Sequence, residues 1–178
     1  MTSRDDLRPA RRAAPSYTLT RVERPSPEFA RFLFTAVGWP WKWYSRLSWD
    51  YARWHTHLER PGVEMWVAYV AGAPAGYFEL VAEGPDVEIA FFGLLPAFIG
   101  QGLGGVLLTA AVERAWRMGP TARVWLHTCD LDHPQALAAY QARGFRVYRS
   151  EQQDESVPAG PFEPWPGARM PGSKSAIS

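Results

Sequence analysis

The chain has 178 residues, of which 47% are hydrophobic, enough for one domain with a substantial core. Nineteen basic and eighteen acidic residues give a net charge of +1, which argues against binding to nucleic acid or to an anionic membrane surface. A single cysteine excludes an intrachain disulfide framework and a cysteine-rich metal site. Because the sequence has no apolar signal segment or membrane span, we expect a cytoplasmic protein.

Both ends of the chain lack a hydrophobic period, so we predict poorly ordered tails over residues 1–16 and 157–178. Residues 17–156 form the predicted single domain. Its first half is predicted to contain, in order, a strand over 17–22, a helix from Ser26-Pro27 to Gly38, a helix over 47–58 with Ser48 as its cap, and strands over 63–70, 75–82 and from Val87. The first half therefore reads as an antiparallel meander preceded by helices.

The most informative segment spans residues 88–105, where an apolar strand enters a glycine-rich loop that opens directly into a helix. Glycines lack a Cβ atom, so the backbone can turn sharply and bring free N–H groups against a phosphate at the positive end of the helix. This pattern indicates an anion site built from backbone amides. The alternative is that the glycines only allow the helix to pack closely on the sheet.

Three further elements follow this glycine-rich loop and its helix. The pattern predicts a helix from Gly102 to about Met118, a strand over 123–129, a helix over 132–144 and a strand over 145–150. We therefore expect a mixed α/β fold, with a mostly antiparallel central sheet, one parallel strand pair and flanking helices.

Two motifs in the second half carry a resemblance to a known family. The first is the strand, Pro96 and glycine loop that lead into a helix, and the second is the helix that ends in Tyr140-Gln-Ala-Arg-Gly-Phe145. Taken together and in this order, they resemble the GNAT superfamily of acyl-CoA-dependent N-acyltransferases over roughly residues 17 to 152.

The resemblance implies that backbone amides of the loop hold the pyrophosphate of coenzyme A. The family loop typically reads Arg or Gln, two residues, Gly, one residue, then Gly or Ala. Gly102 and Gly104 match the two small positions, but Ile99 stands at the Arg or Gln position, which removes one side-chain contact. The coenzyme-binding residues that we expect are Leu94, Leu95, Ile99, Gly100, Gln101, Gly102, Leu103, Gly104, Gly105, His133 and Tyr140.

The second motif places Tyr140 where the family often has a general acid, whose hydroxyl would protonate the departing coenzyme A thiolate. The alternative is a core tyrosine, because Ala136, Tyr140 and Gly144 lie along one helical stripe. His133 replaces the usual Asn of the motif, and it either binds the coenzyme arm or assists proton transfer, or acts only as a cap or surface residue. By the same resemblance, the backbone N–H of Leu94 is the candidate oxyanion donor.

The same glycines also satisfy the dinucleotide pattern G-x-G-x-x-G, with Asp130 at about the right distance for a ribose. Pro96-Ala-Phe-Ile intervenes between the strand and the first glycine, however, and Pro cannot donate to a central ladder. Too little chain follows Asp130 to complete that fold. Dinucleotide binding therefore ranks as a distant alternative.

Glu88 is the candidate general base, because it lies in an otherwise apolar strand and an ammonium acceptor must lose a proton before it attacks a thioester. Alternation places Glu88 on the same strand face as Ala90, Phe92 and Leu94. The alternative to a catalytic role is that Glu88 is a solvated or salt-bridged acid near the end of the strand. With a two-residue turn at Gly84-Pro85, Glu79 shares this face, so either acid can be the base.

Trp39, Trp41 and Trp43 alternate in a segment broken by Pro40, where the resembled family usually forms part of its acceptor pocket. They either stack on an aromatic or cationic acceptor or simply pack over the sheet. Cys129 is expected to be a small buried hydrophobe. No metal site is expected, because neighbouring histidines at positions 55 and 57 face apart on a helix.

The resemblance thus implies an N-acetyltransferase that moves acetyl from acetyl-CoA to a primary amine of a small molecule by direct attack in a ternary complex. The alternative is a non-catalytic protein of the same fold that binds acyl-CoA or a small ligand. Glu79 and the three tryptophans are the expected acceptor-pocket residues. The expected partners include neither nucleic acid nor membrane, and a homodimer is left open.

Overall fold

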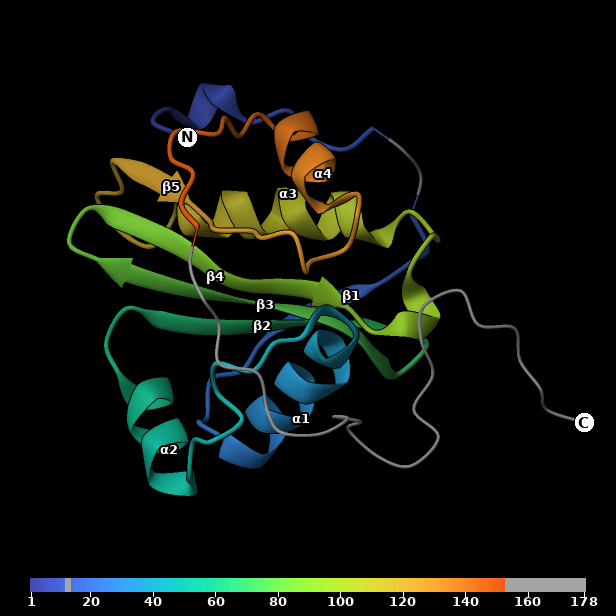
Figure 1. Ribbon diagram of the computed structural model, residues 1–178, viewed down its shortest axis with the longest axis vertical. Coiled ribbons are helices and arrows are strands. Elements are labelled where there is room, and N and C mark those ends of the chain that lie inside the picture. The colour runs from blue at the N-terminus through green and yellow to red at the C-terminus, as the bar shows by residue number, and fades with distance from the viewer. Residues whose placement is uncertain (12–13, 153–178) are drawn as a thin grey trace, which may run out of the picture.

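The computed structural model describes residues 1–11 and 14–152, which form a central sheet between two layers of helices (Figure 1). Helices α1 (Pro27–Gly38) and α2 (Tyr51–Glu59) cover one face of the sheet. Helices α3 (Leu103–Ala115) and α4 (Ala136–Ala142) lie on the other face, together with the N-terminal segment. The predicted class, a mixed sheet with flanking helices, is confirmed.

The sheet has five strands in the order β1-β2-β3-β4-β5. The strands are β1 (Thr18–Arg21), β2 (Val63–Val70), β3 (Ala73–Glu83), β4 (Asp86–Leu94) and β5 (Arg123–Trp125). The first four pair antiparallel with their neighbours, and β5 runs parallel to β4. The predicted meander and the single parallel pair are therefore confirmed.

Capping side chains explain where the first two helices begin. The Ser26 hydroxyl accepts from the backbone N–H of the third helical residue at 3.4 Å, and Pro27 occupies the first position of α1, as predicted. Helix α2 begins later than expected, because the Asp50 carboxylate accepts from the N–H of Arg53 at 2.8 Å. The prediction of Ser48 as the cap is wrong, since an aspartate two residues later makes the bond.

Short 3-10 turns connect several of these elements: η1 (Arg4–Asp6), η2 (Trp39–Trp41) and η3 (Pro96–Phe98). The turn η2 begins the segment between α1 and α2, and η3 lies between β4 and the glycine loop. The predicted strand over 123–129 is only three residues long, and the predicted helix over 132–144 shortens to α4.

Each face of the sheet has its own apolar core. On the α3 face, Phe78 and Leu80 of β3 pack with buried leucines of α3. On the α1 and α2 face, Phe34 and Trp54 pack with Tyr77, the neighbour of Phe78 on β3. Because successive strand residues point to opposite faces, β3 contributes to both cores, and all seven residues from 75 to 81 are buried.

The turn between β3 and β4 sets the register that the sequence left open. Glu83 pairs with Asp86 across the two-residue turn, and Val81 pairs with Glu88. Since alternate residues of β3 share a face, Glu79 and Glu88 lie on the same face of the sheet.

A β-bulge then alters the later part of β4. Leu80 pairs with Ile89 but Glu79 pairs with Phe91, so Ala90 is the extra residue. The bulge bends the strand and reverses the alternation of the residues that follow.

The bulge overturns one expectation about Glu88. Its neighbours Val87 and Ile89 are buried in the α3-side core, so Glu88 points to the opposite face. Phe92 and Leu94 also pack against the α3-side core. The prediction that they share a face with Glu88 is wrong, because strict alternation does not hold across an extra residue.

The N-terminal segment differs from the tail predicted over residues 1–16. The amino group of Met1 donates to the carbonyl of Val124 at 2.9 Å, and the N–H of Val124 donates back at the same distance. Met1 and Leu7 pack against the α3-side core. The first residue thus pairs with the outer edge of β5, and distant contacts order a segment that has no hydrophobic period.

The predicted strand over residues 145–150 does not form. After Phe145, which is buried, the chain becomes exposed, with Val147 and Tyr148 at 60% and 63% relative exposure. The edge of β5 where such a strand would pair is bonded to Met1 at Val124. The predicted C-terminal tail over 157–178 lies outside the described residues.

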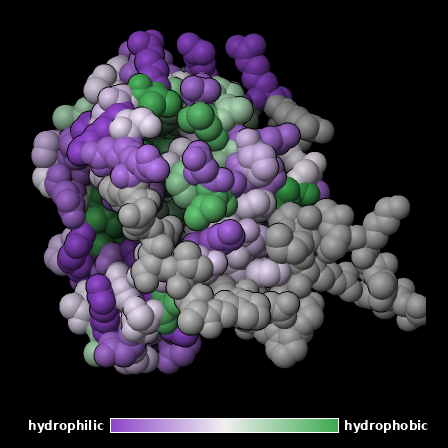
Figure 2. Space-filling model, in the orientation of Figure 1, coloured by the Kyte–Doolittle hydropathy of each residue, from purple (hydrophilic) through white to green (hydrophobic). Residues whose placement is uncertain are grey.

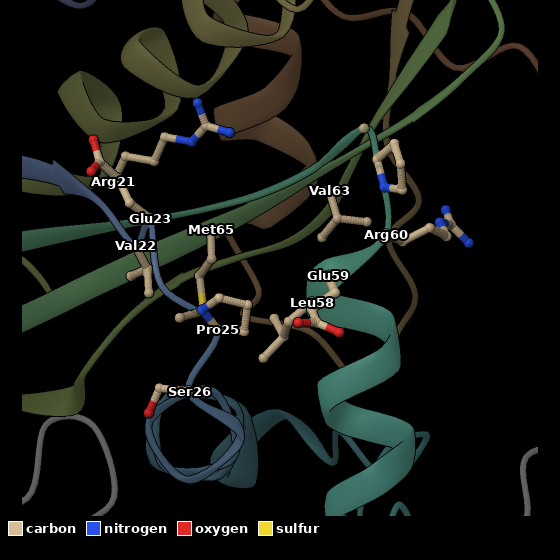
Figure 3. A pocket seen from close by; sticks show the side chains of 12 residues that line it. Arg21, Val22, Glu23, Pro25, Ser26, Leu58, Glu59, Arg60, Val63 and Met65 are labelled. Carbon is tan, nitrogen blue, oxygen red and sulfur yellow. The ribbon is translucent and has the colours of Figure 1, made fainter.

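The surface of the described residues has no large apolar patch in view (Figure 2) and has a hollow that lies away from the glycine loop. Figure 2 shows apolar residues interspersed with polar ones on the face turned to the viewer. A hollow of about 530 Å³ lies between the starts of α1 and β2 and the end of α2, where Ser26, Leu58 and Met65 line it (Figure 3). It contains no residue of the glycine loop. Within the described residues, none of the helices is long and apolar enough to span a membrane.

Candidate active site

Strands β4 and β5 pair only over their first residues and then diverge. We call the gap between the two strands beyond this pairing the wedge. Their parallel pairing covers only Asp86 to Glu88 on β4 and Arg123 to Trp125 on β5. On this side, residues 89–94 of β4 have no partner strand in the described chain. The N–H of Leu95 donates to Ala75 of β3 at 2.9 Å, so by alternation the N–H of Leu94 points into the wedge. Its role as an oxyanion donor stays a prediction.

The glycine loop lies at the wide end of the wedge. Gly100 and Gly102 adopt positive φ angles of 85° and 86°, which side chains disfavour, and Gly102 is the N-cap of α3. The backbone N–H groups of residues 100–104 donate to no acceptor in the part of the chain that the structure describes. The Gln101 side chain instead donates back to the carbonyl of Ala97 at 2.7 Å. The loop therefore presents free backbone donors at a helix N-terminus.

Tyr140 faces the wedge from the α3 side of the sheet. It is 9% exposed, and its ring meets Phe92 of β4 edge-on at 6.3 Å between centroids. Burial raises the pKa of the Tyr140 hydroxyl above its ordinary value, and the negative charge of Asp132 raises it further. The hydroxyl is therefore protonated at neutral pH, so it can donate a hydrogen bond or a proton.

Glu88 lies at the narrow end of the wedge, on the face of α1 and α2. Its carboxylate is hydrogen-bonded to Nδ1 of His127 at 2.9 Å, and the two side chains are 21% and 66% exposed. This bond raises the pKa of His127 above its ordinary value; burial opposes the rise, and the charges of Glu88 and Asp132 add to it. Glu88 is thus accessible and joined to a group that can exchange protons with solvent.

Glu79, the other candidate base, is completely enclosed. It is 1% exposed and accepts two hydrogen bonds from Arg46, at 2.8 and 2.9 Å, while Nε2 of His57 lies 2.9 Å from its carboxylate. Burial alone would raise the pKa of Glu79, but the hydrogen bonds from His57 and Arg46, together with their charges, hold it below its ordinary value. A carboxylate in this state is a weak base.

Aromatic rings surround this buried ion group of Arg46, Glu79 and His57. The guanidinium carbon of Arg46 lies 4.4 Å from the ring centre of Phe91 and 4.5 Å from that of Trp49. The ion group therefore joins the segment between α1 and α2 to the middle of β3.

The tryptophan segment meets the loop before α4 at the open end of the sheet. The Trp41 ring contacts His133 edge-on at 5.0 Å, and Nε1 of Trp43 donates to Asp132 at 3.4 Å. The other oxygen of Asp132 accepts from Thr128 at 2.7 Å. The structure thus brings Trp41 next to His133 and Trp43 next to Asp132, although the residues of the second pair are 89 positions apart in the sequence. Trp39 begins the turn η2 in the same segment.

Three further expectations concern Cys129, His133 and metal binding. Cys129 is exposed, so the prediction of a small buried hydrophobe is wrong; it lies in the loop after β5 rather than in a longer strand. His133 accepts from the N–H of Gln135 at 3.1 Å, which resembles a cap. Across the described residues, no three His, Cys, Asp or Glu side chains gather as a metal site.

A model of the acetyltransferase (GNAT) family matches residues 27–145, which include the wedge, the glycine loop and α4. The chain belongs to the acetyltransferase (GNAT) family. A search of curated proteins gives no match.

Solved structures agree with this acetyltransferase fold. An aminoglycoside acetyltransferase from an uncultured soil metagenomic sample has a TM-score of 0.63 at 15% identity, covering 79% of this chain and 95% of that one. An aminoglycoside N-acetyltransferase in complex with CoA has a TM-score of 0.57 at 15% identity, with coverage of 83% and 98%. The ribosomal-protein-S18-alanine N-acetyltransferase of Escherichia coli has a TM-score of 0.58 at 16% identity, covering 75% of this chain and 80% of that one. At these identities the likeness concerns the fold.

The glycine loop of this GNAT chain has features that suit an anionic group. A Cβ atom added at Gly100 would meet nothing within 4 Å, so the backbone there borders open space. Buried near the first turn of α3, Nε of Arg143 has no hydrogen-bond partner among the described residues. Free amide donors and an unpaired cation suit an anionic group.

Sequence reasoning missed several residues of the site because each depends on a distant contact. Their identities are Arg46, His57, His127, Asp132 and Arg143. The only sequence signal was an acid in an apolar strand at Glu79 and Glu88, which requires a partner without naming it.

Proposed function

We propose that the protein is an N-acetyltransferase that transfers acetyl from acetyl-CoA to a primary amine of a small molecule by direct attack. The observation that carries the proposal is the cradle of free N–H groups over residues 100–104, at the open end of the β4 and β5 wedge. Family membership supports acetyl transfer, and the crystallised relative with bound CoA supports the choice of coenzyme.

The side chains of the wedge suit the three tasks of the reaction. Glu88 accepts the proton of the incoming ammonium, directly or through water, and His127 carries that proton to solvent. The N–H of Leu94 donates to the oxyanion that develops on the acetyl carbonyl. Tyr140 donates its proton to the departing thiolate. Glu88 is preferred over Glu79 as the base because Glu79 is enclosed and hydrogen-bonded.

The cluster of Trp41, Asp132 and His133 supports a cationic amine as the acceptor. An aromatic face attracts a cation, and a carboxylate attracts it further. Trp43 supports this site indirectly, because its ring packs on Phe91 at 5.0 Å and its N–H holds Asp132.

The first test is a calorimetric titration of the purified protein with acetyl-CoA, with NADH as the control ligand. We expect saturable binding of acetyl-CoA and none of NADH. A panel of amines then follows, comprising an aminoglycoside, a polyamine, an alanine-initiated peptide and an aromatic amine, with release of free coenzyme A as the readout. Binding of NADH alone would overturn the proposal in favour of dinucleotide binding.

The second candidate is a non-catalytic acyl-CoA-binding protein of the same fold. It is favoured by two departures from the family motifs, Ile99 in the loop and His133 before α4. Tight acetyl-CoA binding without coenzyme A release over the whole amine panel would support it. The released thiol must be corrected for Cys129, which is exposed and reacts with thiol reagents.

A further inference from the structure

Arg143 lies in the layer that holds α3 and α4, and its guanidinium group has no acceptor among the described residues. It is the C-cap residue of α4, and its Nε atom is buried without a hydrogen-bond partner in the described chain. All of the ion pairs found among the described residues involve basic residues other than Arg143. A buried guanidinium donor without a partner carries a desolvation cost, so an anion that reaches it gains a strong hydrogen bond.

The guanidinium group reaches the first turn of α3. A Cβ atom built on Gly105 would lie 3.4 Å from Nη1 of Arg143. Gly105 is the third residue of α3, directly after the glycine loop. Arg143 therefore adds a full positive charge beside a helix end that already carries positive partial charge. This arrangement is unfavourable by itself and becomes favourable when an anion binds between the two.

The N-terminal segment holds this region together. The N–H of Arg8 donates to the carbonyl of Arg143 at 3.1 Å, and the N–H of Ala10 donates to Oγ1 of Thr109 on α3 at 3.0 Å. The Ala10 methyl would lie 3.3 Å from a Cβ on Gly105. The segment thus crosses from α4 to α3 beside the guanidinium group, which limits the positions that the side chain can adopt.

The loop itself lacks a charged side chain, since residues 95–105 contain neither Lys nor Arg and Ile99 stands at the family's Arg or Gln position. We propose that Arg143 binds a phosphate group of the coenzyme and supplies the side-chain contact that Ile99 does not. This inference rests on the proposed function, because it assigns a further contact within the same coenzyme site.

The test compares Arg143→Gln and Arg143→Lys with the wild type by calorimetry, using acetyl-CoA and 3′-dephospho-CoA as ligands. Arg117→Gln is the matched control, because Arg117 is an exposed arginine beyond the opposite end of α3. We expect Arg143→Gln to weaken acetyl-CoA binding roughly 10- to 100-fold. Arg143→Lys should fall between Gln and the wild type, since it keeps the charge but loses the planar fork. Arg117→Gln should bind as the wild type does.

The two ligands locate the phosphate. Equal weakening for both indicates the pyrophosphate, and weakening for acetyl-CoA alone indicates the 3′-phosphate; either result supports the proposal. A role only as a helix C-cap would lower the thermal midpoint of Arg143→Gln and leave its affinity unchanged, which would overturn it. In that case the wild type still binds acetyl-CoA, so the proposed function stands. If the wild type does not bind acetyl-CoA, both proposals fail.

Discussion

The two sides of the sheet differ in whether their buried charged and polar groups have hydrogen-bond partners. On the α1 and α2 face, Arg46 and His57 both hydrogen-bond to Glu79 under aromatic rings. Near α3, the free N–H groups of residues 100–104 and the guanidinium of Arg143 have no partner among the described residues. Removing one partner of a buried ion pair is strongly destabilising, whereas buried donors without a partner require an explanation such as a bound anion. The difference supports the proposal that the coenzyme binds near α3, whereas the ion group of Arg46, Glu79 and His57 holds the tryptophan segment in place.

The largest effect is expected for Tyr140→Phe, which keeps the ring packed on Phe92 and removes the proton donor. Turnover should fall roughly 10²- to 10⁴-fold, while acetyl-CoA affinity changes little. Steady-state kinetics and calorimetry measure the two quantities. Tyr17→Phe is the control, since Tyr17 packs on the same core but precedes β1, at the far edge of the sheet. Equal loss of turnover and affinity would assign Tyr140 a packing role.

Arg46→Met should destabilise the fold by about 3–5 kcal/mol, because it leaves the buried Glu79 carboxylate without its main partner. Urea unfolding of the unliganded protein measures this change. Arg60→Met is the control, since the Arg60 and Glu83 pair is exposed and should contribute less than about 1 kcal/mol. A similar small loss for both variants would show that the buried ion group is not a stabilising element.

The same ion group predicts a dependence on acid. The pKa of Glu79 is lowered in the folded protein, so its contribution to stability is present above the unfolded pKa and is lost as the pH falls through the folded value. Arg46→Met removes a cause of the lowering. The difference in unfolding free energy between wild type and variant should therefore shrink at acid pH, measured by urea titrations from pH 7 to pH 3. A constant difference over this range would contradict the assignment.

Gly100→Ala and Gly72→Ala form a matched pair that separates backbone strain from ligand binding. Both glycines have positive φ, 85° and 83°, and a Cβ at either would meet nothing within 4 Å. Each variant should lose about 1–2 kcal/mol of stability from the left-handed backbone. Only Gly100→Ala should also weaken acetyl-CoA binding, since its methyl group faces the amide cradle. Equal acetyl-CoA affinity in the two variants would remove the loop from the coenzyme site.

The smallest effect concerns His127. Its folded pKa is raised, so its ion pair with Glu88 stabilises the fold below the unfolded pKa and is lost as the pH rises through the folded value. Because neutral His127 leaves Glu88 free to accept a proton, turnover should rise through this same range. His127→Gln should flatten that limb of the pH profile, and His55→Gln, which alters an exposed pair with Glu59, should retain it. An identical limb in both variants would exclude His127.

Local patterns in the sequence were sufficient for much of the fold. The meander, the parallel pair and the loop before α3 all follow from periodicity and turn residues. Contacts between distant residues could not be read in this way. Arg46 and Glu79 are 33 residues apart, and Ala10 and Thr109 are 99 apart.

The alternating pattern of the sequence also did not reveal the extra residue in β4, although that residue decides on which face Phe92 and Leu94 lie. The start of α2 failed for a related reason, since Ser48 and Asp50 are both good caps and only the folded backbone selects between them. The roles of Glu88, Leu94 and Tyr140 stay predictions, now with defined positions at the wedge.

Hydrogen exchange with and without acetyl-CoA tests the contrast between the two faces most directly. The account predicts slower exchange of the backbone amides over residues 100–105 when acetyl-CoA is bound, because free donors gain an acceptor. Amides of the segment around Arg46 and α2 should change little, since that ion group is already paired. Protection confined to the α1 and α2 face, with an unchanged glycine loop, would contradict the account.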